Sequence, residues 1–257
     1  MKISSVEPFI VHVPINRSSI SDSTHTITHW GVVGTKIVTD TGLVGYGYTG
    51  THAHLESDRL ITSCIAGIYA PLLQGENPLD GDRLWLKLAR YPAVQWVGRA
   101  GITHLALAAV DIALWDLRAK AANMPLYRLL GGSRKRLPAY AGGISLGFQP
   151  PETLVEEARG YLRDGYRAIK LRLGDNVRDD VARVQAVRAA LGPDVDILTD
   201  ANTAWTLADA RRVIPALAEA RVGWLEEPFS ALDFGSYRLA AGLAPQVPIA
   251  AGENHYT

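Results

Sequence analysis

Three short apolar segments in the second half of this chain each end in a carboxylate. The segments read I-L-T-D, V-G-W-L-E and P-I-A-A-G-E, and their carboxylates are Asp200, Glu226 and Glu253. The spacings are 26 and 27 residues (226 − 200 and 253 − 226), and each interval holds a helix-like segment. Such a repeat predicts parallel strands, so we expect the three carboxylates at one edge of a sheet, as at the mouth of an α/β barrel.

A cluster of this kind calls for positive charge, because three carboxylates at one mouth repel one another. A divalent metal ion is the simplest source of that charge. A fourth predicted strand upstream, A-I-K-L-R, ends in the cations Lys170 and Arg172. Asn202 follows Asp200 by two residues, and strand alternation predicts that both side chains lie on the same face.

The composition argues against several other classes of protein. The 257 residues contain 26 Lys and Arg and 26 Asp and Glu, so no broad basic surface for nucleic acid is expected. No apolar run approaches the ~18 residues of a membrane span, and the N-terminus lacks the apolar core of a signal peptide. The single cysteine, Cys64, lies in an apolar helix-like run and is expected to be a buried thiol. We expect a soluble, cytoplasmic globular protein.

The first half of the chain is predicted to contain strands followed by helices. A polar stretch, Asn16–Trp30, lies between the first two strands and is too long for a tight turn. Long loops in compact domains are usually functional or disordered, so histidines such as His25 either face a substrate or lie exposed without a role. The predicted strands are 6–13, 34–39 and 43–48, and the predicted helical region is 55–123, most clearly at 101–123.

From Leu137 the chain alternates between strand and helix. About 120 residues remain (257 − 137 = 120), whereas an eight-stranded barrel takes ~250, so we expect about five strands with exposed edges and a chain shortened from a longer protein. Pro215 is expected to kink or stop its helix early. The predicted strands are 138–146 and those ending at Arg172, Asp200, Glu226 and Glu253, and the predicted helices are 152–164, 178–191, 207–220 and 234–243.

Two long stretches carry a resemblance to a known family. The first, starting at Ala106, reads A-L-A-A-V-D-I-A-L-W-D-L-R-A-K and then P-L-Y-R-L-L-G. The second, from Ile197 to Pro228, holds I-L-T-D-A-N and L-E-E-P. Both resemble the enolase superfamily, specifically its mandelate racemase/muconate-lactonizing enzyme group. The resemblance implies an α/β and α+β protein, with an α+β capping domain at 1–125 and an incomplete, about five-stranded TIM-type β/α barrel at 126–257.

The resemblance also implies a site. Asp200, Glu226 and Glu253 are then the ligands of Mg²⁺, which prefers hard oxygen donors and keeps positions open for water or substrate. Glu227 is expected to orient this site by hydrogen bonding rather than to bind the metal. The substrate-binding residues implied are Asn202 together with His25 and Trp30, because in this family the loop that holds the last two closes over the substrate.

The chemistry implied is removal of the proton α to a carboxylate. Mg²⁺ stabilises the resulting enediolate while a lysine or histidine acts as the base. The family often has Lys-x-Lys where this chain has Lys170-Leu171-Arg172, and a guanidinium holds its proton too firmly to be an ordinary base. Arg172 is therefore expected to bind the substrate carboxylate or stabilise the enediolate. Either Lys170 is the base, or the chemistry relies on an opposite face whose His–Asp pair would lie beyond Thr257.

These features favour dehydration of an acid sugar by the full-length form. One-base abstraction followed by loss of a β-hydroxyl tolerates Arg172, whereas a two-base racemase needs a competent base on each face. A racemase or epimerase, a cycloisomerase, and a catalytically inactive truncated remnant stay open as alternatives. The expected partner is a small-molecule carboxylate, an acid sugar or an α-hydroxy acid, and the resemblance implies a homo-oligomer for the full-length form.

Overall fold

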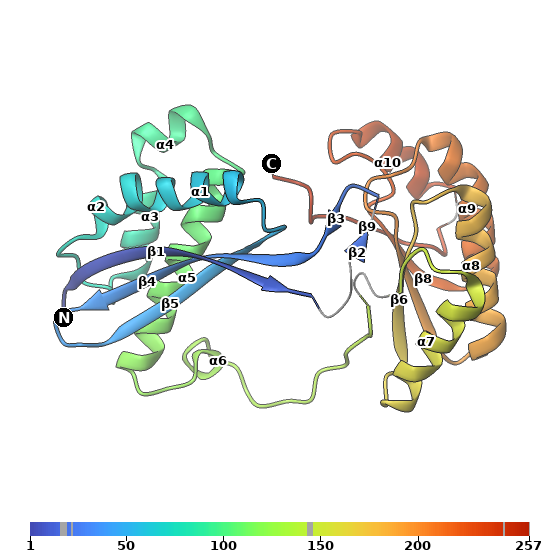
Figure 1. The fold of residues 1–257 in the computed structure, drawn as a ribbon, viewed down its shortest axis with the longest axis horizontal. Helices are drawn as coiled ribbons and strands as arrows, with labels where there is room; N and C mark the ends of the chain where they lie inside the picture. The colour runs from blue at the N-terminus through green and yellow to red at the C-terminus, as the bar shows by residue number, and fades with distance from the viewer. Residues whose placement is uncertain (16–19, 22, 143–145, 244, 257) are drawn as a thin grey trace. The chain divides into compact units, whose positions relative to one another are not determined.

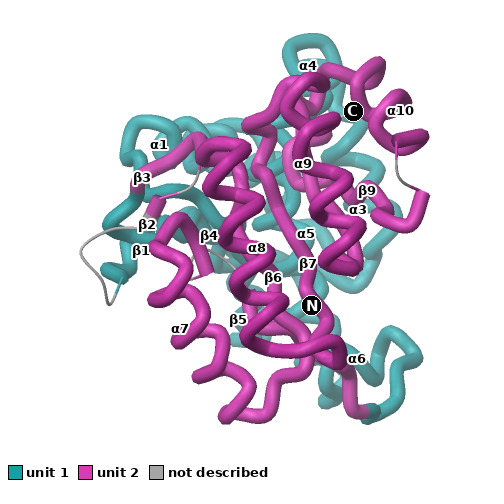
Figure 2. Tube along the Cα trace, turned by 90° about the vertical axis from the view of Figure 1, so that its right-hand side faces the viewer, with its two compact units in different colours: residues 1–18, 27–135, 257 teal, residues 19–26, 136–256 magenta. Residues whose placement is uncertain are grey.

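The computed structural model describes residues 1–15, 20–21, 23–142, 146–243 and 245–256 (Figure 1). The chain divides into two compact units, residues 1–18 with 27–135 and residues 19–26 with 136–256 (Figure 2). Each unit has its own cluster of buried apolar side chains. Within the described ranges, every helix is too short or too polar to cross a bilayer.

The first unit is an antiparallel sheet packed against helices, with strand order β1-β4-β5. Strand β5 lies close to helix α5 because Gly45 and Gly47 present no side chain to it. A Cβ at Gly47 would lie 2.2 Å from the carbonyl oxygen of Ala109. The elements are β1 (Ile3–Pro14), β4 (His29–Thr39), β5 (Val44–Thr51), α1 (Leu55–Cys64), the π-helical turn η1 (Ile65–Tyr69), α2 (Ala70–Leu73), α3 (Gly81–Ala89), α4 (Pro92–Val97), α5 (Ile102–Ala121) and α6 (Leu126–Leu129).

Helix α5 is the central buried helix of this unit, as the Ala- and Leu-rich sequence predicts. Its alanines at 106, 109 and 113 are buried, and their small side chains allow the close approach of β5. Leu114 and Leu117 are fully buried, and burying a leucine side chain stabilises a fold by roughly 1.5–3 kcal/mol. Cys64 is a buried free thiol in the same core, as expected.

The second unit is a parallel sheet with strand order β6-β7-β8-β9, and helices α7 to α10 lie along one of its faces (Figure 1). Strand alternation directs Ile169, Leu171 and Ile197 into the apolar core of this unit, so the intervening residues face the other side. The elements are α7 (Pro151–Arg163), β6 (Ala168–Arg172), α8 (Val177–Leu191), β7 (Asp196–Asp200), α9 (Leu207–Glu219), β8 (Val222–Glu226), α10 (Phe234–Ala241) and β9 (Ile249–Ala250).

The predicted loop 16–30 differs from the observed structure. Strand β4 begins at His29 and pairs Trp30 with Val13, so Trp30 is a strand residue. Two short strands, β2 (Ile20–Ser21) and β3 (Thr26–Ile27), pair within the stretch. Pairing with β1 from Pro14 and His29 onward makes β4 begin before the strand start expected at residue 34. Residues 16–19 and 22 lie outside the described part.

Two expectations for the second unit need correction, and the helix predicted at 207–220 is confirmed. The predicted strand at 138–146 is reduced to one parallel bridge between Ala141 and Ile169, and residues 143–145 lie outside the described part. Helix α9 does not stop at Pro215, because that residue lies on the exposed side, where water can satisfy the carbonyl that loses its N–H partner. Strand β9 ends at Ala250, so Glu253 lies on a turn and not at a strand end.

Candidate metal centre

The charged residues of the site come from adjacent ends of parallel strands. Lys170 and Arg172 belong to β6, Asp200 is the last residue of β7, and Glu226 is the last residue of β8. The strand register pairs Arg172 with Asp200 and Asp200 with Glu226. All four side chains lie on the sheet face opposite the buried Ile169 and Leu171, because side chains alternate along each strand. The sequence prediction that these groups share one edge is confirmed.

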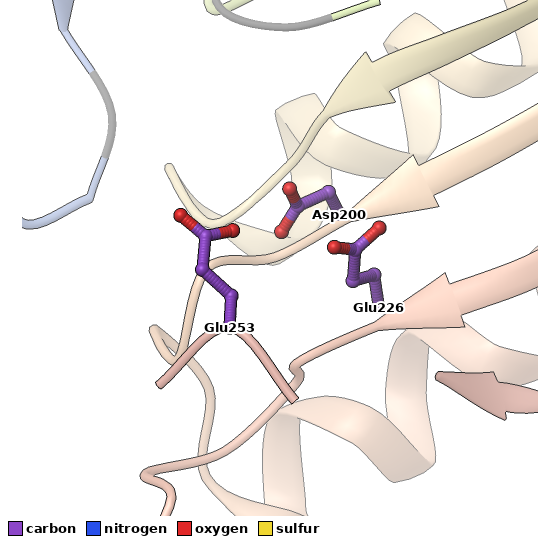
Figure 3. Close-up of side chains that lie close together, drawn as sticks. All are labelled: Asp200, Glu226 and Glu253. Carbon is purple, nitrogen blue, oxygen red and sulfur yellow. The ribbon is translucent and has the colours of Figure 1, made fainter. Parts of the chain in front are cut away.

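The three carboxylates converge. One oxygen from each of Asp200, Glu226 and Glu253 lies within 4.8 Å of the others (Figure 3). Asp200 is buried, Glu226 is half-buried and Glu253 is exposed. Opposite ligands of an octahedral Mg²⁺ lie about 4.2 Å apart, so the span and the all-oxygen donor set fit that ion. The residues present are therefore suited to hold magnesium.

Two cations of the chain lie among these carboxylates. The Lys170 ammonium donates to Asp200 Oδ2 at 3.1 Å and to Glu226 Oε2 at 3.0 Å. Arg172 donates through a terminal guanidinium nitrogen to Asp200 Oδ2 at 3.1 Å. Both residues are buried. The repulsion expected of three converging carboxylates is thus relieved in part by protein side chains and not by a metal ion alone.

The pKa values reflect this crowding. Burial acts to lower the pKa of Lys170, but the charges and hydrogen bonds of Asp200 and Glu226 outweigh it, and the pKa is raised above its ordinary value. The pKa of Glu253 is also raised, first by loss of hydration around its carboxyl group and then by the like charges of Asp200 and Glu227. A bound cation would relieve that repulsion by stabilising the charged form of Glu253.

Glu227 holds the turn that carries Glu253. Its side chain is almost completely buried, and Oε1 accepts hydrogen bonds from the backbone N–H groups of Gly252 at 3.1 Å and Asn254 at 2.9 Å. Oε2 accepts from the Asn254 amide. Burial acts to raise the pKa of Glu227, but these hydrogen bonds outweigh it and the pKa is lowered. Glu227 therefore fixes the residues on both sides of Glu253, in the orienting role expected from the sequence.

Asn202 lies beside Asp200, although not for the reason expected. Strand β7 ends at Asp200, and Asn202 has the left-handed φ of 42°, so strand alternation does not apply to it. The backbone N–H of Asn202 instead donates to Asp200 Oδ1 at 2.9 Å, which closes a local turn. The Asn202 carbonyl accepts from Ser23 at 2.6 Å, and its side-chain amide donates to Thr24 at 3.3 Å.

The two substrate-binding residues predicted near the N-terminus have different positions. His25 Nδ1 lies 2.6 Å from the Thr24 hydroxyl, and the same hydroxyl accepts a hydrogen bond from the Asn202 amide. Trp30 belongs to the first unit, where its ring centroid lies 6.4 Å from that of His52. Substrate contact by either residue stays a prediction.

Sequence reasoning missed one aromatic residue of the site. Trp224 precedes Glu226 by two residues on β8, and its indole N–H donates to Glu226 Oε2 at 3.3 Å. The alternation that places Glu226 on the site face places Trp224 there as well, so the signal was present in the sequence. Ser23 and Thr24 were also missed as neighbours of Asn202, and no local pattern pairs residues so far apart.

Comparisons with known proteins agree with this architecture. Residues 5–131 match the family model for the N-terminal domain of mandelate racemase / muconate lactonizing enzymes, and residues 153–257 match the enolase C-terminal domain-like model. A 3,6-anhydro-alpha-L-galactonate cycloisomerase from Streptomyces coelicolor is 33% identical over 258 residues, which span 99% of this chain and 69% of that protein.

Two solved structures are also similar. An enolase superfamily member from Polaromonas sp. JS666 has a TM-score of 0.92 and 47% identity, covering 100% of this chain and 67% of that one. L-talarate/galactarate dehydratase from Salmonella typhimurium, solved with Mg and L-lyxarohydroxamate, has a TM-score of 0.87 and 30% identity, covering 98% of this chain and 64% of that one. This chain therefore spans about two thirds of the length of these proteins.

Proposed function

Because the chain belongs to the mandelate racemase / muconate lactonizing enzyme group of the enolase superfamily, we propose that its site removes the proton α to the carboxylate of an acid sugar and so begins the loss of water. The observation that carries the proposal is the position of Lys170, whose ammonium contacts two of the three carboxylates suited to hold magnesium. A substrate carboxylate bound to a magnesium ion at these three carboxylates would lie directly beside the Lys170 amine.

A Mg²⁺ ion held by Asp200, Glu226 and Glu253 would supply positive charge to stabilise the negative charge that develops on the substrate carboxylate. Lys170 takes the proton, and for this its amine must be neutral. The carboxylates that raise the pKa of Lys170 are the same groups that bind the cation. When their charge is neutralised, burial lowers the pKa of this lysine without opposition and favours the basic form.

Arg172 binds the substrate carboxylate in this proposal. Its Nε is buried and has no hydrogen-bond partner among the described residues, while a terminal nitrogen of the same group donates to Asp200. An unpaired buried donor costs roughly 1–3 kcal/mol, and a substrate oxygen would satisfy it. The guanidinium keeps its charge at any working pH, so Arg172 positions the substrate and does not compete with Lys170 as the base.

Dehydration is the reaction that these groups favour. One base on this face is sufficient when a β-hydroxyl leaves, whereas racemisation needs a second base on the opposite face. Ser23 and Thr24 bring hydroxyl groups to Asn202, which suits a substrate with several hydroxyls. The dehydratase from Salmonella typhimurium supports the same class of reaction.

The larger architecture is part of the proposal. The strands β6 to β9 are parallel and adjacent in chain order, and helices lie along one face, which is the arrangement of a TIM-type β/α barrel. We infer that this sheet is an incomplete, barrel-type domain and that the first unit is an α+β capping domain. Homo-oligomeric assembly of the full-length form belongs to the same proposal.

The test is isotope exchange combined with detection of water loss. The chain is incubated in deuterated water with Mg²⁺ and a panel of aldonic and aldaric acids, and the products are analysed by NMR and mass spectrometry. We expect a product lacking one water, and we expect Lys170→Met to abolish it while Lys135→Met, at an exposed position, leaves it unchanged.

Other outcomes identify the alternatives. Deuterium at the α-carbon without water loss indicates a racemase or epimerase, and an isomer of unchanged mass formed by ring opening or closure indicates a cycloisomerase. A chain that binds Mg²⁺ but catalyses neither exchange nor water loss refutes the proposal and indicates an inactive remnant.

The metal site is tested separately by calorimetric titration with Mg²⁺. We expect binding to the unaltered chain and none to Asp200→Ala, because Asp200 is the most buried of the three ligands and the one contacted by both cations. Circular dichroism confirms that the variant is folded. A folded, unaltered chain that fails to bind Mg²⁺ refutes the assignment of Asp200, Glu226 and Glu253 as ligands.

A further inference from the structure

Trp224 and Glu226 lie two residues apart on β8 and share the face of the sheet that carries the site. The indole N–H of Trp224 donates to Glu226 Oε2 at 3.3 Å. The indole ring also packs against the ring of Tyr140 in a T-shaped contact, with centroids 5.8 Å apart and planes at 81°. The donor is therefore held in place by packing and not only by the hydrogen bond it makes.

The two oxygens of Glu226 have different surroundings. Oε2 accepts from both Trp224 and Lys170, whereas no hydrogen bond reaches Oε1 from the described residues. In Figure 3 one oxygen of Glu226 points toward the Asp200 and Glu253 carboxylates, and the other points away from them. Holding Oε2 thus leaves Oε1 available as the oxygen that would ligate a cation.

The two donors to Oε2 differ in charge. Lys170 carries a positive charge, is shared with Asp200, and repels a divalent cation placed between the carboxylates. The Trp224 indole is neutral, and its N–H donates to Glu226. It can therefore orient this carboxylate without opposing the metal, and it can remain in place when Lys170 turns toward a substrate.

We propose that Trp224 is a positioning residue for the metal centre: its indole N–H holds Glu226 Oε2 so that Oε1 faces the cation. The inference rests on the proposed magnesium site. Partners that orient metal ligands contribute about 10–100-fold to metal affinity, so loss of this hydrogen bond weakens binding by about tenfold or more.

The experiment compares Trp224→Phe with Trp205→Phe by calorimetric titration with Mg²⁺. Phenylalanine keeps an aromatic ring and removes the N–H donor, and the loss of ring volume is the same in both variants. Trp205 is the matched control, because its indole also donates to a carboxylate at 3.3 Å, that of the fully buried Asp180, which is not a metal ligand. We expect Trp224→Phe to lose about tenfold or more in affinity and Trp205→Phe to lose less than about twofold.

A second measurement uses the unaltered chain, so its result does not depend on whether a variant folds. In a chain labelled with ¹⁵N-tryptophan, the indole N–H signal of Trp224 is expected to shift during a Mg²⁺ titration, while that of Trp205 stays in place. Equal affinities of Trp224→Phe and the unaltered chain, or a Trp224 signal that does not move when Mg²⁺ binds, overturn the positioning role and leave the metal site standing. An unaltered chain that does not bind Mg²⁺ overturns both.

Discussion

Glu227 determines where Glu253 lies, although it does not itself join the carboxylate cluster. Its two oxygens accept three hydrogen bonds from residues 252–254, which form the turn around Glu253. Replacing it with alanine leaves two backbone N–H groups without acceptors and frees that turn. We expect Glu227→Ala to weaken Mg²⁺ binding by about tenfold or more, measured by calorimetric titration.

The conservative variant separates geometry from charge. In Glu227→Gln, the side-chain oxygen still accepts from the backbone of Gly252 and Asn254, and its NH₂ group pairs with the Asn254 amide once that amide is turned over. We therefore expect Glu227→Gln to retain most of the affinity. If glutamine weakens binding as much as alanine does, charge and not the position of the turn is what Glu227 contributes.

The residues of the site differ in how far the sequence determines them. Lys170, Asp200 and Glu226 were predictable, because a residue that ends a short apolar strand has its direction set by alternation. Glu253 was found by spacing, yet its position depends on Glu227 and the turn. Ser23 contacts Asn202 across 179 residues (202 − 23), and such a contact arises from the tertiary fold and not from any local pattern.

Among the elements, helix α8 depends on a single arginine at its C-terminal end. The half-buried guanidinium of Arg188 donates four hydrogen bonds to backbone carbonyls in the loops around the start of β7 and β8. The acceptors are the carbonyls of Gly192, Val195, Ala220 and Arg221, at 2.7 to 3.3 Å. Gly192 follows the end of α8, and Ala220 and Arg221 follow the end of α9, where intrahelical donors are lacking, while Val195 directly precedes β7.

We expect Arg188→Ala to lower the free energy of unfolding by roughly 2–4 kcal/mol, since the carbonyls of the buried residues Val195 and Ala220 lose a charged donor. Urea denaturation followed by circular dichroism measures the change. Arg178→Ala, at an exposed position on the same helix, is the control and is expected to change stability by less than about 0.5 kcal/mol. Similar losses in the two variants would show that the carbonyl contacts of Arg188 do not stabilise the unit.

The ion pairs of Glu76, in the connection between α2 and α3, are expected to make the Tm depend on pH. Hydrogen bonds from Arg83 and then Lys87 lower the pKa of Glu76 from 4.5 to about 2. A depressed carboxyl pKa contributes stability that is fully present above the unfolded value near 4.5 and is lost as the pH falls through about 2. We expect Glu76→Gln to lower the Tm at pH 7 and to converge with the unaltered chain near pH 2. A constant Tm difference across this range would contradict the ion pairs.

Element types followed from the sequence more closely than element ends did. Periodicity placed the β6, β7 and β8 strands and the four helices between Pro151 and Ala241 correctly, because each has one apolar face against a common core. The errors lie where tertiary contacts decide the outcome. Strand β4 is extended by pairing with β1, and strand β9 ends at Ala250, before the turn that carries Glu253.

At the scale of the whole molecule, the residues that the structure describes form two hydrophobic cores. One core includes the sheet β1-β4-β5 and α5, and the other lies between β6–β9 and their helices. The whole candidate site belongs to the second unit, residues 19–26 with 136–256. It comprises the three carboxylates, the two cations and the hydrogen bonds that Glu227 accepts from the turn around Glu253. A ligand bound by these groups stabilises the native form of that unit, because the unfolded chain does not assemble the site.

We therefore expect Mg²⁺ to protect the second unit selectively in hydrogen–deuterium exchange. At a Mg²⁺ concentration of about 100 Kd, the gain is about 2.7 kcal/mol for openings that break the site. Peptides from residues 146–243 should exchange more slowly, and so should residues 23–26, because Ser23 and Thr24 bond to Asn202. Peptides from β1, β4 and α5 should be unaffected, and Asp200→Ala should abolish the response. Equal protection of both units would show that they unfold as one, and protection confined to the first unit would place the cation elsewhere.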